Sequence, residues 1–215
     1  MDAVETLHQE GISVGVSPTI SQLNLYEIVE FTTYFTNRKI PVWYCLYCYD
    51  QLTEDSLFTI GKKDNELEIS DRETFVKVCD QLIEMKKQKP GIFITDKTLA
   101  VLKQLFVSGK RTWTCRALQN FLMVDHLGRV SGCHCQEPVA SVSELLDVWE
   151  SPLFEDYRRK YNHCGRCVYL CYVFYSIHSS VLGNIEIARD QFKNAKTIAL
   201  GTSPPLHSFL NVDIA

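Results

Sequence analysis

The sequence of 215 residues predicts an α/β fold. Its composition, 46% hydrophobic and 22% charged residues, is that of a folded globular protein. In the first fifty residues, short apolar runs alternate with helical patterns, and from Trp113 onward a hairpin pattern, short helices and closely spaced cysteines replace them. We therefore expect an α/β part over residues 1–107, a small α+β module over 108–182, and a C-terminal helix and tail over 183–215.

The first fifty residues predict two βα units. Residues 3–9 have a helical pattern that Gly11 ends, and residues 12–16 form a short β-branched apolar run. Residues 25–36 are amphipathic with helical spacing, and residues 42–49 form a second apolar run. Parallel strands that are buried on both faces read as continuous apolar runs joined by helices, which is the pattern observed.

Two further helices are expected in the rest of the α/β part. Ser70 and Glu73 have the spacing of a capping box, and apolar residues then recur at helical spacing as far as the basic residues before Pro90. Residues 92–94 form another short apolar run, and residues 97–106 predict a second helix.

The second half predicts shorter elements. A β-hairpin is expected over residues 120–131, with Gly128 at a turn position that requires a positive φ. Ser141 and Ser151 have the sequence context of helix N-caps, so we expect two short helices after them. Residues 185–200 have the pattern of a longer helix.

Charge and hydropathy exclude several classes of protein. The 22 Lys and Arg residues against 26 Asp and Glu give a net charge of -4, which argues against a nucleic acid partner. Residues 1–10 lack the basic start and apolar core of a signal peptide. The longest apolar runs are shorter than the roughly 20 residues that span a bilayer. We expect a cytoplasmic protein that binds neither membrane nor nucleic acid.

The main functional signal is the distribution of nine cysteines, six of which lie between Cys115 and Cys171. In a reducing compartment such crowding indicates metal ligation. Cys164 and Cys167 form a CxxC pair, which can place two sulfurs on one metal through a tight turn. A hairpin with cysteines near its ends can add two more sulfurs. An all-sulfur set selects zinc or an iron–sulfur cluster, and the spacing leaves both open.

The pattern Cys115-x12-Gly128-x4-Cys133, followed after a gap by Cys164-x2-Cys167-x3-Cys171, resembles the SPASM/Twitch extension of radical S-adenosylmethionine (radical SAM) enzymes. The hairpin and the segment before Cys164 are similar to those of the family as well. The resemblance implies one auxiliary 4Fe–4S cluster, with Cys115, Cys133, Cys164 and Cys167 as ligands and Cys171 as a possible substitute. In that family, the auxiliary cluster transfers electrons or supports the substrate site.

The resemblance extends more loosely to residues 1–50, which look like later units of the partial (β/α)6 barrel of these enzymes. The CxxxCxxC loop that defines the family is absent from this sequence, and Cys45 and Cys48 supply only a CxxC. The resemblance therefore implies the C-terminal portion of a radical SAM enzyme. A separate half with that loop would be needed to bind and cleave S-adenosylmethionine, and a small electron-transfer protein is the other implied partner.

Plainer interpretations compete with each of these. The four-cysteine set could be a structural zinc site in an interaction module without redox function. Cys135 is expected to be a spare thiol beside the ligands. Cys45 and Cys48 resemble a redox CxxC, but on a strand their side chains would point to opposite faces, so we expect buried strand cysteines. Cys79 is expected to be a small apolar core residue in a helix.

Overall fold

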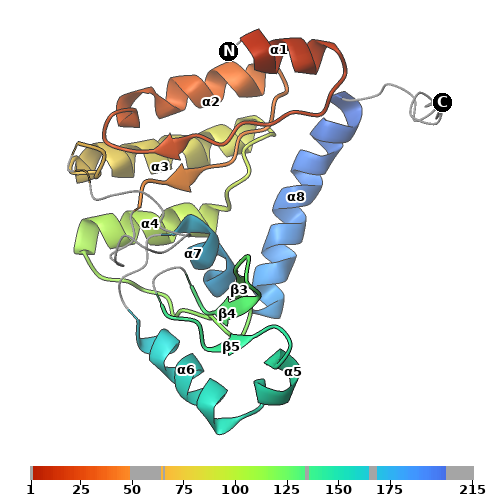
Figure 1. Ribbon diagram of the computed structural model, residues 1–215. Coiled ribbons are helices and arrows are strands. Elements are labelled where there is room, and N and C mark those ends of the chain that lie inside the picture. The colour runs from red at the N-terminus through yellow and green to blue at the C-terminus, as the bar shows by residue number, and fades with distance from the viewer. Residues whose placement is uncertain (1, 49–63, 65, 134–135, 165–168, 202–215) are drawn as a thin grey trace, which may run out of the picture.

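The computed structural model describes residues 2–48, 64, 66–133, 136–164 and 169–201. It confirms the mixed α/β class, with long helices and two small sheets. Figure 1 shows α1 and α2 at one end, the strands β3–β5 with α5 and α6 at the other, and α8 along one side. In the part of the chain described, no helix is both long and apolar enough to cross a membrane. The elements are α1 (Asp2–Gln9), β1 (Thr19–Ile20), the 3-10 turn η1 (Leu25–Glu27), α2 (Ile28–Asn37), β2 (Cys45–Leu46), α3 (Arg72–Gln88), α4 (Asp96–Ser108), β3 (Met123–Val124), β4 (Arg129–Ser131), β5 (Ala140–Ser141), α5 (Leu145–Val148), α6 (Pro152–His163), α7 (Leu170–Ile177) and α8 (Val181–Gly201).

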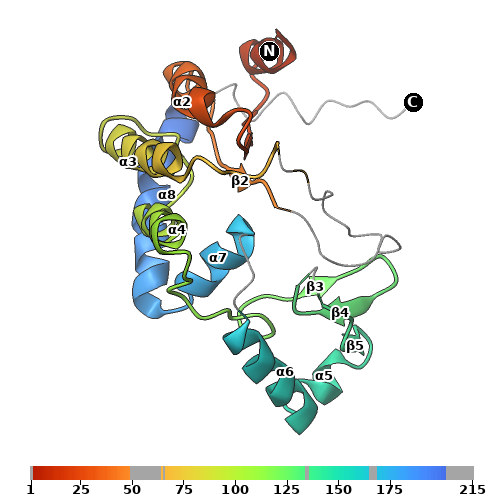
Figure 2. The same ribbon diagram turned by 90° about the vertical axis from the view of Figure 1, so that its left-hand side faces the viewer.

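Three parallel segments make up the N-terminal sheet. β1 pairs with β2 in parallel, and an isolated parallel bridge joins Val42 to Ile92 beyond β2. Each segment is followed by a helix, α2, α3 and α4 in turn, and Figure 2 shows these helices along one side of β2. The predicted pair of βα units is thus present, and the apolar run at residues 92–94 adds a third parallel segment.

The first predicted strand is displaced along the chain. Of the expected residues 12–16, Ile12 is 49% exposed and only Val16 forms a bridge, while the paired strand lies at Thr19–Ile20. The indole ring of Trp43 explains part of this, because a Cβ on Gly15 would lie 2.5 Å from it. The close approach of Trp43 to the backbone at Gly15 favours an irregular segment there.

The helices largely follow the expected ranges, but two expected caps are wrong. Ser141 lies in β5 and donates its hydroxyl to the Glu144 carboxylate at 2.7 Å, and Glu144 is the N-cap of α5. α3 begins after Asp71, whose carboxylate accepts a hydrogen bond from the Thr74 backbone N–H at 3.0 Å, so Ser70 is not the cap. Gln22 accounts for the difference, because its side-chain oxygen accepts from the backbone N–H and the hydroxyl of Ser70. Ser151 caps α6 as predicted, accepting from the Phe154 N–H.

The predicted hairpin is confirmed, and it belongs to a three-stranded antiparallel sheet of order β3-β4-β5. Gly128 has φ 73° in the turn between β3 and β4, as its position required. β5 and α7 are elements that the sequence patterns did not predict. A second buried cluster, separate from the core under the parallel sheet, lies between this sheet and α6; its buried members are Cys115, Ala117, Leu118, Val130, Phe154 and Tyr161.

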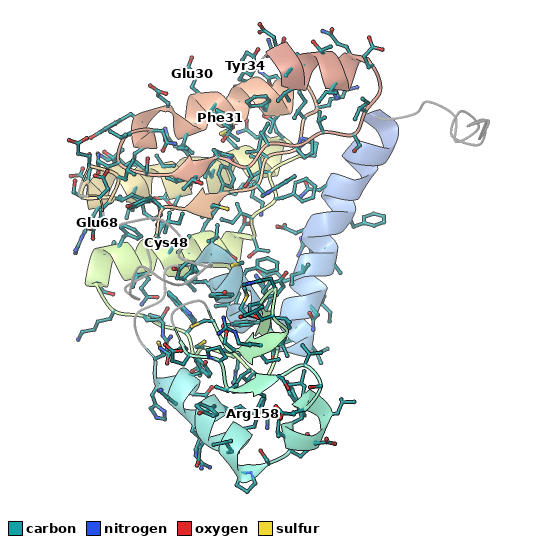
Figure 3. All side chains as sticks on the ribbon, in the orientation of Figure 1. Glu30, Phe31, Tyr34, Cys48, Glu68 and Arg158 are labelled. Atoms are coloured by element: carbon teal, nitrogen blue, oxygen red, sulfur yellow. The ribbon has the colours of Figure 1, made fainter. Side chains whose placement is uncertain are left out.

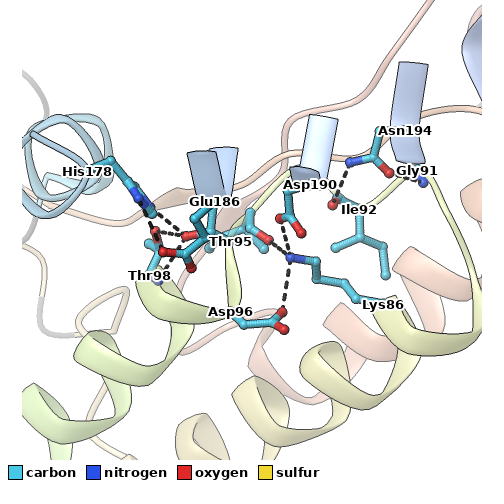
Figure 4. Close-up of polar contacts among 11 residues, drawn as sticks. Lys86, Gly91, Ile92, Thr95, Asp96, Thr98, His178, Glu186, Asp190 and Asn194 are labelled. Atoms are coloured by element: carbon cyan, nitrogen blue, oxygen red, sulfur yellow. Dashed lines mark hydrogen bonds and ion pairs between the residues drawn. The ribbon is translucent and has the colours of Figure 1, made fainter. Parts of the chain in front are cut away.

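α8 docks on the α/β part through polar contacts (Figure 4). The Lys86 ammonium, on a side chain 9% exposed, lies 2.6 Å from the Asp190 carboxylate of α8 and 3.1 Å from Asp96. The Asn194 side chain accepts from the Gly91 N–H at 2.9 Å and donates to the Ile92 carbonyl at 3.3 Å. α8 therefore provides hydrogen-bond partners for backbone groups at the outer edge of the third parallel segment.

Candidate metal centre

Cys115 is the most buried of the three predicted ligands that the structure describes. It is 8% exposed and follows α4 and its left-handed C-cap Gly109. Burial is the main cause that raises the pKa of the Cys115 thiol, and the nearby Cys164 raises it further. The Ala117 backbone N–H and the Ser176 hydroxyl hydrogen-bond to the sulfur and lower the pKa. Such donors stabilise a thiolate, which is the form that binds metal.

Tyr161 shares a buried cluster with Cys115. It is 3% exposed, and its pKa is raised chiefly by burial and then by the neighbouring Cys133 and Cys115 thiols. Cys115 belongs to the same buried cluster as Tyr161, and Cys133 packs against that cluster. Cys164, which raises the pKa of Cys115, is the C-cap of α6, three residues after Tyr161. Cys115 and Cys133 thus lie at the cluster that holds Tyr161, and Cys164 follows at the end of the same helix.

Local hydrogen bonds hold the loop of Cys133 against α6. The Gly132 N–H donates to the Tyr161 hydroxyl at 3.1 Å, and the Ser131 hydroxyl donates to the Cys133 carbonyl at 3.1 Å. A Cβ on Gly132 would lie 2.3 Å from the Tyr161 ring, so the close approach requires glycine. The segment after β4 is therefore fitted to the face of Tyr161.

Arg158, in the middle of α6, connects this helix to its neighbours (Figure 3). Its guanidinium donates to the Leu118 carbonyl at 2.9 Å and to the Trp149 carbonyl at 2.7 Å, and it lies 4.7 Å from the centre of the Trp149 ring. These contacts tie α6 to the loop that follows Cys115 and to the end of α5. As a result, the segment that carries Cys115 and the helix that ends at Cys164 form one unit.

Arg111 is a site residue that the sequence reasoning missed. It lowers the pKa of Cys115, and its Nη2 donates to the Asn162 carbonyl at 3.2 Å. Arg111 is half-buried, and its buried Nη1 has no hydrogen-bond partner among the described residues. A cation with a free buried donor near a thiol fits an anionic ligand there. The only sequence signal was a basic residue four positions before Cys115, which is too common to single out.

The remaining predicted residues are placed as follows. Cys167 and Cys135 lie outside the described residues. Cys171, on α7, lines a different cavity together with Cys45 and Cys48, and Cys45 is among the neighbours that raise its pKa. Figure 3 labels Cys48 in the half of the molecule opposite to α6. Within the described ranges, no group of three or more His, Cys, Asp or Glu side chains has an arrangement ready to hold a metal ion.

Two expectations about the other cysteines can be compared with the structure. Cys79 is 2% exposed in α3, and burial raises its pKa to about 12, as expected of an apolar core residue. Cys45 is exposed, so the expectation of a buried strand cysteine was wrong for it. β2 is only two residues long, and its alternation ends before Cys48, which explains why both residues reach one cavity.

Comparisons of this chain with protein families, with curated proteins and with solved structures found no significant match.

Proposed function

We propose that this chain is an iron–sulfur protein that forms the C-terminal portion of a radical SAM enzyme. Its auxiliary 4Fe–4S cluster is bound by Cys115, Cys133, Cys164 and Cys167. The observation that supports the proposal is the buried cluster that holds Cys115 and Tyr161, against which Cys133 packs, with Cys164 at the end of the helix that carries Tyr161. The CxxC spacing brings Cys167 close to Cys164 in the chain.

The surroundings of these thiols suit a cluster. A 4Fe–4S core with four thiolates carries net negative charge, which the Arg111 guanidinium offsets, and its Nη1 is free to donate to a sulfur atom. Donation from the Ala117 N–H and the Ser176 hydroxyl to Cys115 raises the reduction potential of a bound cluster. With four protein ligands no iron is open, which favours electron transfer or support of the substrate site over direct substrate binding.

The α/β part supports the same assignment. Three parallel segments in chain order, each followed by a helix, fit the later units of a partial (β/α) barrel. On the described residues, β1 pairs with β2 and no strand pairs with its other edge. An open parallel edge can accept strands from a separate half that bears the CxxxCxxC loop. In this proposal that half binds S-adenosylmethionine, and a small electron-transfer protein reduces the clusters.

Anaerobic purification, with iron, acid-labile sulfide and zinc analysis and visible spectroscopy, tests the proposal. We expect about four iron and four sulfide per chain and a broad visible absorption band. Cys164→Ala should lose most of the iron and the band. The matched control is Cys171→Ala, which should keep both because Cys171 lines another cavity.

Two outcomes would contradict the proposal. A colourless protein with one equivalent of zinc would support the zinc-stabilised interaction module instead. Equal loss of iron in Cys164→Ala and Cys171→Ala would show that the cluster is not at the proposed site. The intact chain mixed with S-adenosylmethionine and dithionite should form no 5'-deoxyadenosine, because its sequence lacks the CxxxCxxC loop.

A further inference from the structure

A cavity of about 650 Å³ lies on the inner side of the parallel segments, between β2, the residues after Ile92 and α7. It is distinct from the proposed cluster site, since none of Cys115, Cys133 and Cys164 lines it. Its size is that of sites for drug-sized ligands. We call it the thiol–aromatic pocket, after lining residues that include Trp43, Phe93, Phe174 and Tyr175 and the three cysteines described next.

Three cysteines line this pocket: Cys45, Cys48 and Cys171. Cys45 and Cys171 are both exposed residues, although burial of its sulfur raises the pKa of Cys171. The Ser17 hydroxyl lies 3.7 Å from the Cys45 sulfur. At the rim, Trp43 is 43% exposed and Tyr175 is 51% exposed. Two large aromatic side chains and the Cys45 thiol are therefore accessible from solvent at one opening.

The pocket offers little to a charged ligand. None of its described lining residues is charged. Several of its hydroxyl groups already have partners within the protein. Tyr44 and Thr32 share a hydrogen bond of 2.8 Å between their hydroxyls, Thr98 and Thr95 share one of the same length, and the Tyr47 hydroxyl accepts from the Asp64 N–H at 3.1 Å. A charged molecule would lose its hydration here without compensation.

We propose that the thiol–aromatic pocket binds a neutral, planar aromatic molecule, which lies against Trp43 and Tyr175 and within reach of the Cys45 thiol. Flat rings on both sides of the cavity suit stacking and edge contacts with such a ligand. Sulfur atoms also make favourable contacts with aromatic rings. The inference does not depend on the proposed cluster, because it uses only the lining residues and their hydrogen bonds.

Thiol labelling of the full chain tests this proposal. Two maleimides with the same reactive group are compared, the neutral N-phenylmaleimide and the anionic N-carboxymethylmaleimide. In each reaction the sulfur forms a C–S bond to one alkene carbon, the alkene π bond breaks, and the thiol proton ends on the neighbouring carbon. Peptide mass spectrometry gives the rate at Cys45. Val107→Cys supplies a matched exposed thiol on α4, since Val107 is 70% exposed and outside the pocket.

At Cys45 the ratio of the phenyl rate to the carboxymethyl rate should exceed that at position 107 by roughly tenfold, because part of the phenyl ring is buried before reaction. Cys171→Phe fills the pocket and should bring the ratio at Cys45 down to that at position 107. In the chain that carries only Val107→Cys, saturating indole should slow labelling of Cys45 and leave labelling at position 107 unchanged.

Equal ratios at the two positions, or no protection by indole, would overturn the proposal. Protection of Cys45 by S-adenosylmethionine and not by indole would overturn it as well, because that ligand is charged. Indole protection is measured without any pocket substitution, so the test stands even if Cys171→Phe fails to fold. Iron content is measured on the same samples, so loss of the cluster and loss of pocket binding are read separately.

Discussion

Replacing Gly132 by alanine should destabilise the cysteine module more than its small size suggests. The new Cβ would lie 2.3 Å from the Tyr161 Cζ atom, so one of the two must move by about 1 Å to reach ordinary contact distance. The ring is 3% exposed and belongs to α6, so it cannot swing into solvent. Overpacking of this kind costs about 1–3 kcal/mol, and the weakened bond from the Gly132 N–H to the Tyr161 hydroxyl adds about 1 kcal/mol.

We therefore expect Gly132→Ala to lower the free energy of unfolding by about 2–4 kcal/mol, measured by urea denaturation of the iron-free protein with far-UV circular dichroism. The control is Gly128→Ala in the same hairpin, where φ is 73° but no atom lies within 4 Å of the new Cβ. Backbone strain alone should cost it about 1 kcal/mol. The double variant Gly132→Ala, Tyr161→Leu should show favourable coupling. Equal costs for the two alanine variants, without coupling, would refute the argument.

Two further predictions concern the seam between α8 and the α/β part. Lys86→Met should lower the free energy of unfolding by about 3 kcal/mol in urea denaturation, because it leaves the α8 carboxylate without its buried cation. Lys87→Met, which removes only an exposed pair, should change it by less than about 0.5 kcal/mol, and similar effects of both would refute the argument. Burial lowers the pKa of His178, so the folded state favours the neutral imidazole. The free energy of unfolding should therefore be unaffected by His178 above the ordinary pKa of 6.5 and should decrease as the pH falls below that value. Thermal unfolding between about pH 8 and pH 5 measures this decline, which His178→Gln should reduce; an unchanged decline would exclude His178 as its source.

Periodicity and turn chemistry predicted most helices and the hairpin. α2, α4, α6 and α8 follow local apolar spacing, and Gly128 takes the positive φ that its turn demands. The cap of α3 shows where local rules fail. Ser70 has the right spacing to Glu73, but its hydroxyl and N–H are taken by Gln22, which is remote in sequence, so Asp71 caps the helix. A competing partner that folding brings in cannot be read from the local pattern.

The candidate site also contains residues that local spacing predicts and a residue that it does not predict. Spacing predicted Cys115, Cys133 and Cys164 as ligands, and the structure places Cys115 and Cys133 at the cluster that holds Tyr161. Spacing could not identify Arg111, because its importance arises from burial beside Cys115 and an unpaired Nη1.

The sequence by itself determined the α/β class and most helix boundaries, because these depend on composition and on contacts within a few residues. Only the tertiary structure decided which thiols are neighbours. Cys171 is four residues from Cys167 in the chain, yet α7 packs against α4 and β2 and puts its side chain in the thiol–aromatic pocket with Cys45. The physical reason is that the direction of a side chain depends on which face of its helix is buried, and that is fixed by packing between distant segments.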